Sequence, residues 1–192
     1  MYILLGFCAF LSGYLLGSVP FCLWLPKIVC GVDIRNYIGN IGVSAVYRAL
    51  GLKMAVLVLL CELGKGIPAL FLLSYFTGEP VNMVIAALGV FLGHKYSLFL
   101  GFRHRKDQIT ALGILMYLLP AGSIAGLGAG LLSLRATRFV PVTWAVIYLV
   151  TALTGWYLQY PLPYVMFSVA IASLSIKRML KKLLKRNGVS YV

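Results

Sequence analysis

The chain has 192 residues, of which 61% are hydrophobic and only 11% are charged, and its mean hydropathy is +0.96. The charged share is less than half that of a typical soluble domain, so the composition excludes an ordinary soluble fold and predicts an integral membrane protein. The net charge of +13 comes from 17 basic and 4 acidic residues. Because these charges lie between apolar runs, they favour membrane orientation and attraction to anionic lipid or phosphorylated substrate over nucleic-acid binding.

The apolar runs are long enough to cross a bilayer as helices, which takes about 20 residues each. The first run lacks the positive start and the small-residue cleavage site of a secretory signal, so we expect it to be a retained span. The interval 109–134 is interrupted halfway by Pro120 and Gly122. The uninterrupted spans are expected over residues 2–25, 54–76, 81–100, 139–158 and 161–176.

Basic residues in the connecting segments predict the orientation, because Lys and Arg accumulate on the cytoplasmic side of a membrane. The basic segments are residues 26–53, 101–108, 135–138 and 177–186. The links around Glu79 and over residues 159–163 carry no basic residue and are expected outside. The interval 109–134 lies between two basic segments, so it must cross an even number of times, as two helices that turn at Pro120. The prediction is an all-α protein with about seven transmembrane helices, including short or broken ones, an external N-terminus and a cytoplasmic C-terminus.

The whole chain, residues 1–192, is predicted to form a single polytopic membrane domain with a basic amphipathic cytoplasmic tail over 177–192. Residues 177–186 place four apolar side chains at helical spacing among six Lys and Arg residues. This pattern is typical of a helix that lies on an anionic leaflet. Membrane anchoring is the first interpretation of this helix, and capture of an anionic substrate is the alternative.

Two polar segments are candidates for anion binding. Residues 33–44 include glycines that allow backbone N–H groups to turn toward one anion. Together with Arg48, this segment either binds a phosphate or serves as a cytoplasmic linker. The basic run over residues 103–107 either holds an anionic headgroup or only sets the orientation.

Charged residues also occur inside the apolar runs. Glu62 and Lys65 lie three residues apart within the predicted span 54–76. Charges at that depth pair with each other or line a polar cavity, and both interpretations stay open for these two. His94, near the inner end of its span, is expected to be a hydrogen-bonded structural residue.

The sequence contains no carboxylate dyad, Ser-His-Asp arrangement or zinc-ligand spacing that can be identified. The catalytic residues are therefore unknown at this stage, and no metal or cofactor is expected. The cysteines are expected to be small buried hydrophobes without a disulfide, and they are Cys8, Cys22, Cys30 and Cys61.

Several short motifs follow one another in a fixed register along residues 13–145. They are Gly17-Ser18-Val19-Pro20-Phe21, Gly31-Val32-Asp33-Ile34-Arg35, Gly39-Asn40-Ile41-Gly42, Arg48-Ala49-Leu50-Gly51, Glu62-Leu63-Gly64-Lys65-Gly66, Leu92-Gly93-His94, Lys106, Thr110, Leu112-Gly113, Pro120 and Arg138. In these motifs the chain resembles the PlsY-type acyl-phosphate:glycerol-3-phosphate acyltransferases of bacterial inner membranes. Beyond residue 145 the resemblance continues more loosely to the end.

The resemblance implies that the protein transfers an acyl group from acyl phosphate to the 1-hydroxyl of glycerol 3-phosphate, giving lysophosphatidic acid for phospholipid synthesis. It also implies a seven-span fold, in agreement with the count from charge, and catalysis by positioning of two anionic substrates without a dedicated base. The substrate- and phosphate-binding residues that it implies are Arg35, Gly39, Asn40, Gly42, Ser44, Arg48, Lys65, His94, Lys106, Thr110 and Arg138.

The chain departs from the family pattern within the site. The family's Gly-Gly-Lys-Gly loop reads His104-Arg105-Lys106-Asp107 here, and Ala45 and Pro141 replace an Asn and a substrate-contacting Ser. His104 is a candidate general base, and the alternative is that it only fills the space of a glycine. Three interpretations stay open: an acyltransferase with a rebuilt cationic site, a catalytically silent homologue that binds acyl phosphate or phospholipid as a sensor or partner protein, and an acyltransferase with another anionic acceptor.

The expected partners are acyl phosphate, glycerol 3-phosphate and anionic membrane lipid, with no nucleic acid. The protein is expected to be a monomer that crosses the bacterial inner membrane several times, with its site on the cytoplasmic face.

Overall fold

The computed structural model describes residues 2–36, 42–76, 79–102, 105 and 108–186. These residues form helices joined by short turns, as the predicted all-α fold requires. The chain divides into two compact units, Met1–Ile114 and Leu115–Val192, and the boundary falls within helix α6 (Ile109–Leu118). Each unit has its own packing and is described separately.

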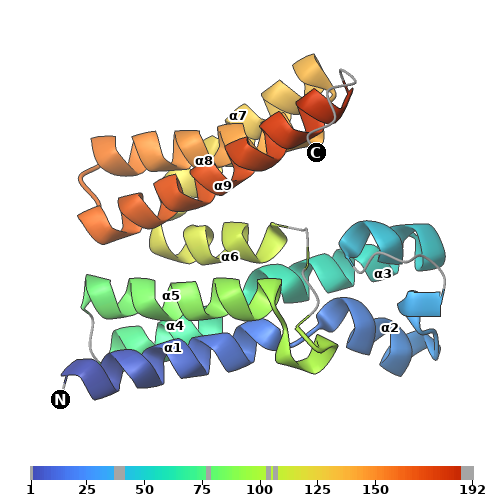
Figure 1. Ribbon diagram of the computed structural model, residues 1–192, viewed down its shortest axis with the longest axis horizontal. Coiled ribbons are helices and arrows are strands. Elements are labelled where there is room, and N and C mark those ends of the chain that lie inside the picture. Colours follow the sequence, from blue (N-terminus) through green and yellow to red (C-terminus); the bar gives the residue numbers. More distant parts are fainter. Residues whose placement is uncertain (1, 37–41, 77–78, 103–104, 106–107, 187–192) are drawn as a thin grey trace. The chain divides into compact units, whose positions relative to one another are not determined.

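The helices of the first unit are shown in Figure 1 in blue to green. They are α1 (Tyr2–Ser18), α2 (Phe21–Cys30), η1 (Ile34–Asn36), α3 (Val43–Gly64), α4 (Ile67–Phe76), α5 (Pro80–Lys95) and η2 (Leu98–Leu100), followed by the first part of α6. The predicted span 2–25 is therefore not one helix, because α1 and α2 are bent by 43° at the break between them. Pro20 explains the break, since proline lacks a backbone N–H and disfavours the helical conformation of the residue before it.

The predicted span 54–76 also consists of two helices. Its first part belongs to α3, which begins at Val43 and is kinked at Gly51, where φ is 79°. That backbone conformation is open to glycine and strained for other residues. The helical path breaks again after Gly64, and α4 begins at Ile67.

Glycines allow α1 and α5 to pack backbone against backbone. A Cβ atom on Gly17 would overlap the carbonyl of Val90, and one on Gly93 would overlap the carbonyl of Tyr14. Small residues at such positions are typical of helix pairs in membranes, where close approach increases van der Waals contact. Ser97 after α5 then donates a hydrogen bond to the carbonyl of Ser18. The packing therefore brings the end of α1 beside the end of α5 (Figure 1).

A separate apolar cluster holds α2 and η1 against α3. Its buried side chains come from α2, η1, α3 and η2, and they are Cys22, Leu23, Ile34, Ala45, Val46, Met54, Ala55, Val58 and Leu100. Because the cluster includes the start of α2 and also η1, which follows that helix, it fixes the direction that the chain takes after the Pro20 break.

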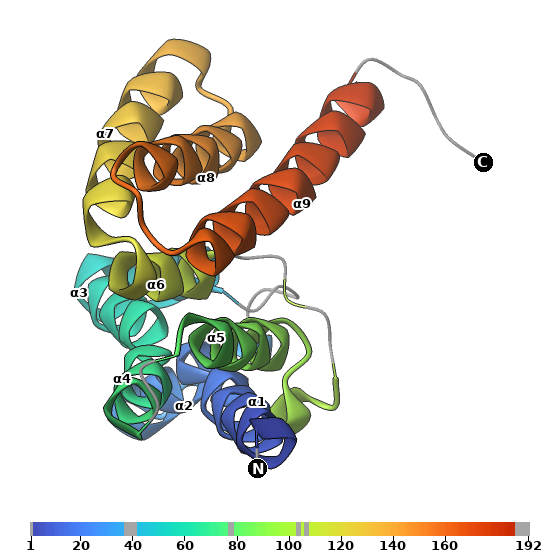
Figure 2. The ribbon, with the colours of Figure 1, turned by 90° about the vertical axis from the view of Figure 1, so that its left-hand side faces the viewer.

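The second unit consists of α7 (Pro120–Thr137), α8 (Val140–Tyr157) and α9 (Leu162–Arg186), with α8 in contact with both others (Figure 2). The predicted break at Pro120 is confirmed, because α6 ends at Leu118 and α7 begins at Pro120. The segment 177–186 is helical but continues α9 without a break, so it does not form a helix separate from the last span. Gly122 and Gly126 on α7 face the backbone of α8, where a Cβ atom would meet the carbonyl oxygens of Thr151 and Ile147.

Two helical stretches of the described chain are long and apolar enough to cross a bilayer, residues 43–75 and 140–157, and the bent pair α1 and α2 adds a third. Helices α5 and α6 are apolar but shorter. Large apolar side chains are exposed along these helices, as expected where lipid is the solvent. The prediction that the cysteines are buried is confirmed for Cys22 alone, because Cys8 and Cys30 are exposed and Cys61 is partly buried. Outward-facing cysteines are compatible with lipid contact, since a thiol is a small apolar group.

Candidate functional site

A carboxylate, Glu62, is buried at the end of α3 in the first unit. Its Oε2 atom lies 2.8 Å from Lys65 Nζ, and its Oε1 atom lies 2.9 Å from Arg105 Nη2. The three side chains are each only 1–2% exposed. Charges removed from solvent to this extent must be paired, and here one carboxylate serves two cations. The pairing that the sequence left open for Glu62 and Lys65 is therefore a buried ion pair, and Arg105 is a second partner.

His94 and Thr110 complete the cluster around Glu62. Lys65 Nζ lies 2.7 Å from His94 Nδ1 and 3.3 Å from the carbonyl oxygen of Val19. Glu62 Oε2 is a third neighbour of this ammonium group, at 2.8 Å. His94 Nδ1 also lies 3.3 Å from Glu62 Oε2, so the histidine ring contacts both members of the ion pair. Thr110 Oγ1 lies 3.0 Å from His94 Nδ1 and from the main-chain oxygen of Glu62.

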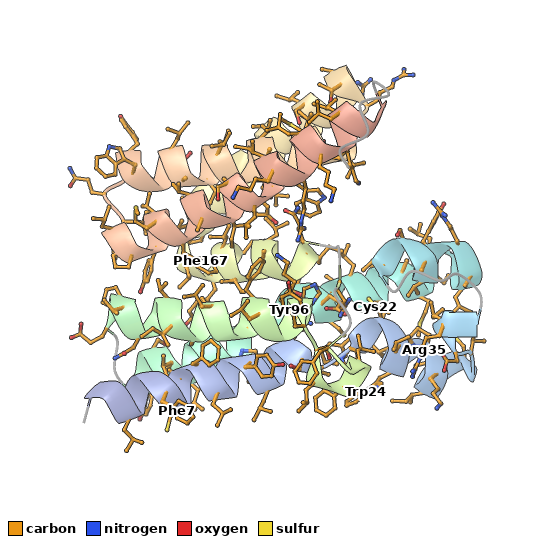
Figure 3. The ribbon with its side chains drawn as sticks, in the orientation of Figure 1. Phe7, Cys22, Trp24, Arg35, Tyr96 and Phe167 are labelled. Atoms are coloured by element: carbon orange, nitrogen blue, oxygen red, sulfur yellow. The ribbon has the colours of Figure 1, made fainter. Side chains whose placement is uncertain are left out.

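The cluster connects five parts of the first unit. Cys22 at the start of α2 donates its backbone N–H to Glu62 Oε1 at 3.3 Å, and its Sγ atom lies 3.2 Å from Arg105 Nη2. The other members come from the ends of α3 and α5, from residue 105 and from the start of α6. Figure 3 labels Cys22 where these elements meet. One carboxylate and two cations leave these side chains with a net charge of +1, so the cluster favours anions nearby.

The local sequence explains how these groups meet. Glu62 and Lys65 are three residues apart, which places them on one side of the helical turn. Gly113 lies against the carbonyl of Leu63, where a Cβ atom would overlap the oxygen. This close approach brings the first turn of α6, with Thr110, against the last turn of α3.

The structure groups three of the predicted site residues, Lys65, His94 and Thr110, around Glu62. His94 is buried and within hydrogen-bond distance of Lys65 and Thr110. Gly39, Asn40, His104 and Lys106 lie outside the described residues. The remaining predicted residues are not members of the cluster, and they are Arg35, Gly42, Ser44, Arg48 and Arg138.

Gly42, Ser44 and Arg48 lie at the start of α3. Gly42 is the buried N-cap residue, whereas Ser44 and Arg48 are exposed in the first two turns. A helix N-terminus with a nearby cation is an electrostatically favourable place for a phosphate. These three residues therefore remain a candidate anion-binding group.

Arg35 and Arg138 are exposed cations at two other places. Arg35 pairs with Asp33 at 3.4 Å, with side chains 54% and 30% exposed, and Figure 3 labels it beyond the end of α2. Arg138 ends α7 in the second unit with a φ of 51°. Both side chains are accessible to a charged ligand within their own units.

Arg105 is the described residue of the run 103–107, and its position differs from both interpretations of that run. Its guanidinium is buried on Glu62 because the second carboxylate oxygen needs a donor, so this residue neither cradles a headgroup nor acts only on orientation. Sequence reasoning missed the contact, since 43 residues separate the partners. No sequence signal identified Arg105 as a partner, because Glu62 already has Lys65 three residues away as an ion-pair partner. Among the described residues, no group of three His, Cys, Asp or Glu side chains could hold a metal ion.

Comparison with known proteins gives one consistent result. The sequence model of the family described as glycerol-3-phosphate acyltransferase matches residues 7–186. A glycerol-3-phosphate acyltransferase of Synechococcus sp. (strain JA-3-3Ab) is 39% identical over 163 residues, which cover 84% of this chain and 80% of that protein. One of Shouchella clausii (strain KSM-K16) is 34% identical over 175 residues, covering 88% of this chain and 85% of that protein.

Solved structures show the same likeness. The crystal structure of PlsY, an integral membrane glycerol 3-phosphate acyltransferase, in its glycerol 3-phosphate form is similar with a TM-score of 0.80 and 27% identity. The form with lysophosphatidic acid gives a TM-score of 0.81 and 25% identity. Each similarity covers 97% of this chain and 94% of the other.

Proposed function

Because the chain belongs to the glycerol-3-phosphate acyltransferase family, we propose that it transfers an acyl group from acyl phosphate to the 1-hydroxyl of glycerol 3-phosphate. The product is lysophosphatidic acid, which enters phospholipid synthesis. The observation that carries the proposal is the family match over residues 7–186, which spans the cluster and the sequence motifs between residues 17 and 138. Similarity to PlsY in its glycerol 3-phosphate and lysophosphatidic acid forms supports the same substrate and product. The relatives named above are called acyltransferases, which gives the silent-homologue alternative no support.

The reaction brings together two substrates that each carry a negatively charged phosphate group. The hydroxyl oxygen of glycerol 3-phosphate attacks the acyl carbon, the bond from that carbon to the phosphate oxygen breaks, and the hydroxyl proton leaves with the released phosphate. Cations that hold both substrates in line supply proximity and stabilise the developing negative charge. Arg48, Lys106 and Arg138 are the proposed phosphate-binding cations, with Arg35, Gly39, Asn40, Gly42 and Ser44 in supporting positions. No side chain is assigned as a dedicated base.

Lys65, His94 and Thr110 have a different part in this proposal. Their polar atoms lie within hydrogen-bond distance of Glu62 or of one another inside the protein. We assign them to the framework that holds the ends of α3, α5 and α6 together beside the site. The net positive charge of the cluster adds a favourable potential for the anionic substrates.

The direct test is turnover by the purified protein in detergent or in vesicles. Radiolabelled acyl phosphate and glycerol 3-phosphate should give labelled lysophosphatidic acid. Lys106→Ala should lower turnover by about 10²-fold or more, the scale of losing one preorganised electrostatic donor. The matched control is Lys53→Ala, which removes an exposed cation of α3 that has no assigned role. Absence of product from the unaltered protein, or equal rates for the two variants, would contradict the proposal.

We also propose the membrane arrangement that the basic segments predict: about seven crossings, an external N-terminus and a cytoplasmic C-terminus in a bacterial inner membrane, with the site on the cytoplasmic face. The basic end of α9 then lies on anionic lipid, and residues 1–192 act as one monomeric domain. Single cysteines in a cysteine-free background test the orientation. Position 79 should react with an impermeant maleimide in intact cells, and position 53 should react only after the cells are opened. The reverse pattern would refute the proposed orientation.

A further inference from the structure

An open groove runs along the last turns of α7 in the second unit. Its volume is about 690 Å³, and it is lined by Gly128, Leu131, Leu132, Leu134 and Arg135. Leu131 and Leu132 are 67% and 73% exposed. Gly128 keeps the groove open, because it has no side chain and no atom lies within 4 Å of the place that a Cβ would take. The groove is therefore apolar along its length and has one cation, Arg135, at its end.

The groove lies on the side of α7 that α8 does not cover. Gly122 and Gly126 lie against carbonyl oxygens of α8, and Gly130 lies against the side chain of Ile147 in the same helix. Gly128 is two residues from Gly126 and from Gly130, which is a little more than half a helical turn. A lipid can therefore enter the groove from the side without displacing α8.

The charge of the second unit favours an anionic occupant. The sequence contains no Asp or Glu over residues 115–192. The basic residues of this segment are Arg135, Arg138, Lys177, Arg178, Lys181, Lys182, Lys185 and Arg186. Because α8 packs against both α7 and α9 through short links, the last turns of α7 and α9 lie at the same end of the unit (Figure 1). Basic residues gathered at one end, in a unit without a carboxylate side chain, attract the anionic lipids of a membrane surface.

We propose that this groove is a binding site for one anionic phospholipid of the cytoplasmic leaflet, with an acyl chain along the leucines and the phosphate at Arg135. Gly128 and Arg135 are seven residues apart in one helix, which corresponds to about 10 Å. The hydrocarbon of one leaflet is about 15 Å thick, half of the bilayer core, so the groove fits within that leaflet. The guanidinium offers two N–H groups to a phosphate. This site is additional to the substrate site of the proposed acyl transfer and does not depend on that activity.

Native mass spectrometry of the purified, delipidated protein tests the headgroup contact. In a titration, one molecule of phosphatidylglycerol should bind more tightly than the rest and more tightly than phosphatidylcholine, whose choline cancels the phosphate charge. Arg135→Gln should weaken this first binding step by about fivefold, the scale of one cation at an anionic surface. The control is Lys182→Gln, which removes an exposed cation of α9 outside the groove and should leave the first step nearly unchanged. Equal losses in the two variants would show that net charge alone attracts the lipid and would overturn the site.

Filling the groove tests the acyl-chain contact. Gly128→Leu places a side chain in the groove, and Gly128→Ala is its matched control. Both variants are expected to fold, since leucine and alanine favour a helix more than glycine does, and their melting temperatures check this. Gly128→Leu should lower the affinity for the first phosphatidylglycerol at least as much as Arg135→Gln, whereas Gly128→Ala should retain it.

Three results with Gly128→Leu would overturn the proposal. Unchanged phosphatidylglycerol binding would show that the lipid does not use the groove. Loss of a dimer in the same spectra would show that a second copy of the chain occupies it. A higher KM for acyl phosphate with unchanged phosphatidylglycerol binding would assign the groove to the substrate.

Discussion

Replacing Glu62 by Gln is the sharpest test of the buried cluster, because it removes one charge and almost no volume. The unaltered cluster combines one carboxylate with the Lys65 ammonium and the Arg105 guanidinium. Glu62→Gln leaves those two cations buried, with a summed charge of +2 in place of +1. The new amide retains one oxygen acceptor but presents an NH₂ group to a donor on its other side.

The magnitude follows from burial. Because Glu62, Lys65 and Arg105 are 1–2% exposed, solvent cannot screen the cations that lose their partner. Removing one member of a buried ion pair costs about 3–5 kcal/mol of folding stability. For a chain of this size, that corresponds to a decrease in melting temperature of roughly 6–20 °C.

The matched control is Asp33→Asn, the same chemical change in the pair with Arg35. That pair is 3.4 Å apart and its side chains are 54% and 30% exposed, so its loss should change stability by about 0–1 kcal/mol. Thermal unfolding in one detergent, at one protein concentration, compares the two variants. A Glu62→Gln protein as stable as Asp33→Asn would refute the reasoning that the cluster depends on charge pairing.

Three further predictions concern packing, hydrogen bonding and phosphate binding. Gly93→Ala should destabilise the protein by about 1–3 kcal/mol, because the new Cβ overlaps the Tyr14 carbonyl. Gly128→Ala, with no atom within 4 Å of the new Cβ, should be neutral or stabilising by up to about 1 kcal/mol in the same unfolding assay. Thr110→Val should cost about 0.5–1.5 kcal/mol, since it removes the hydroxyl that lies 3.0 Å from the main-chain oxygen of Glu62, and equal stability would show that this hydrogen bond contributes nothing. Arg48→Lys should lower kcat/KM for glycerol 3-phosphate about tenfold, because an ammonium cannot form the bidentate fork of a guanidinium, and an unchanged value in steady-state kinetics would exclude a bidentate contact.

The sequence was sufficient for the class of the fold and for one of its breaks. Low charge and long apolar runs require lipid as solvent, and lipid requires backbone groups to be satisfied within helices. The break at Pro120 is local chemistry, since proline cannot continue a helix but suits its first turn. The same chemistry at Pro20 was present in the sequence, but the apolar run through it concealed the bend between α1 and α2.

The family could also be predicted from the sequence, because its motifs are short and keep their spacing. The implied residues Lys65, His94 and Thr110 do lie together in the structure. The second cation that binds their shared partner, Glu62, could not be predicted. A carboxylate three residues before a lysine predicts one ion pair and gives no sign of another cation.

The tertiary structure alone decided the role of Arg105. In the sequence it is one of several basic residues in a short run, and composition gives no reason to separate it from its neighbours. The close packing of Gly113 on Leu63 and of Gly93 on Tyr14 brings the ends of α1, α3, α5 and α6 together. Only then does Glu62 meet a guanidinium 43 residues away. Local pattern determines helices and their apolar faces, whereas the pairing of buried charges depends on which helix ends the packing places side by side.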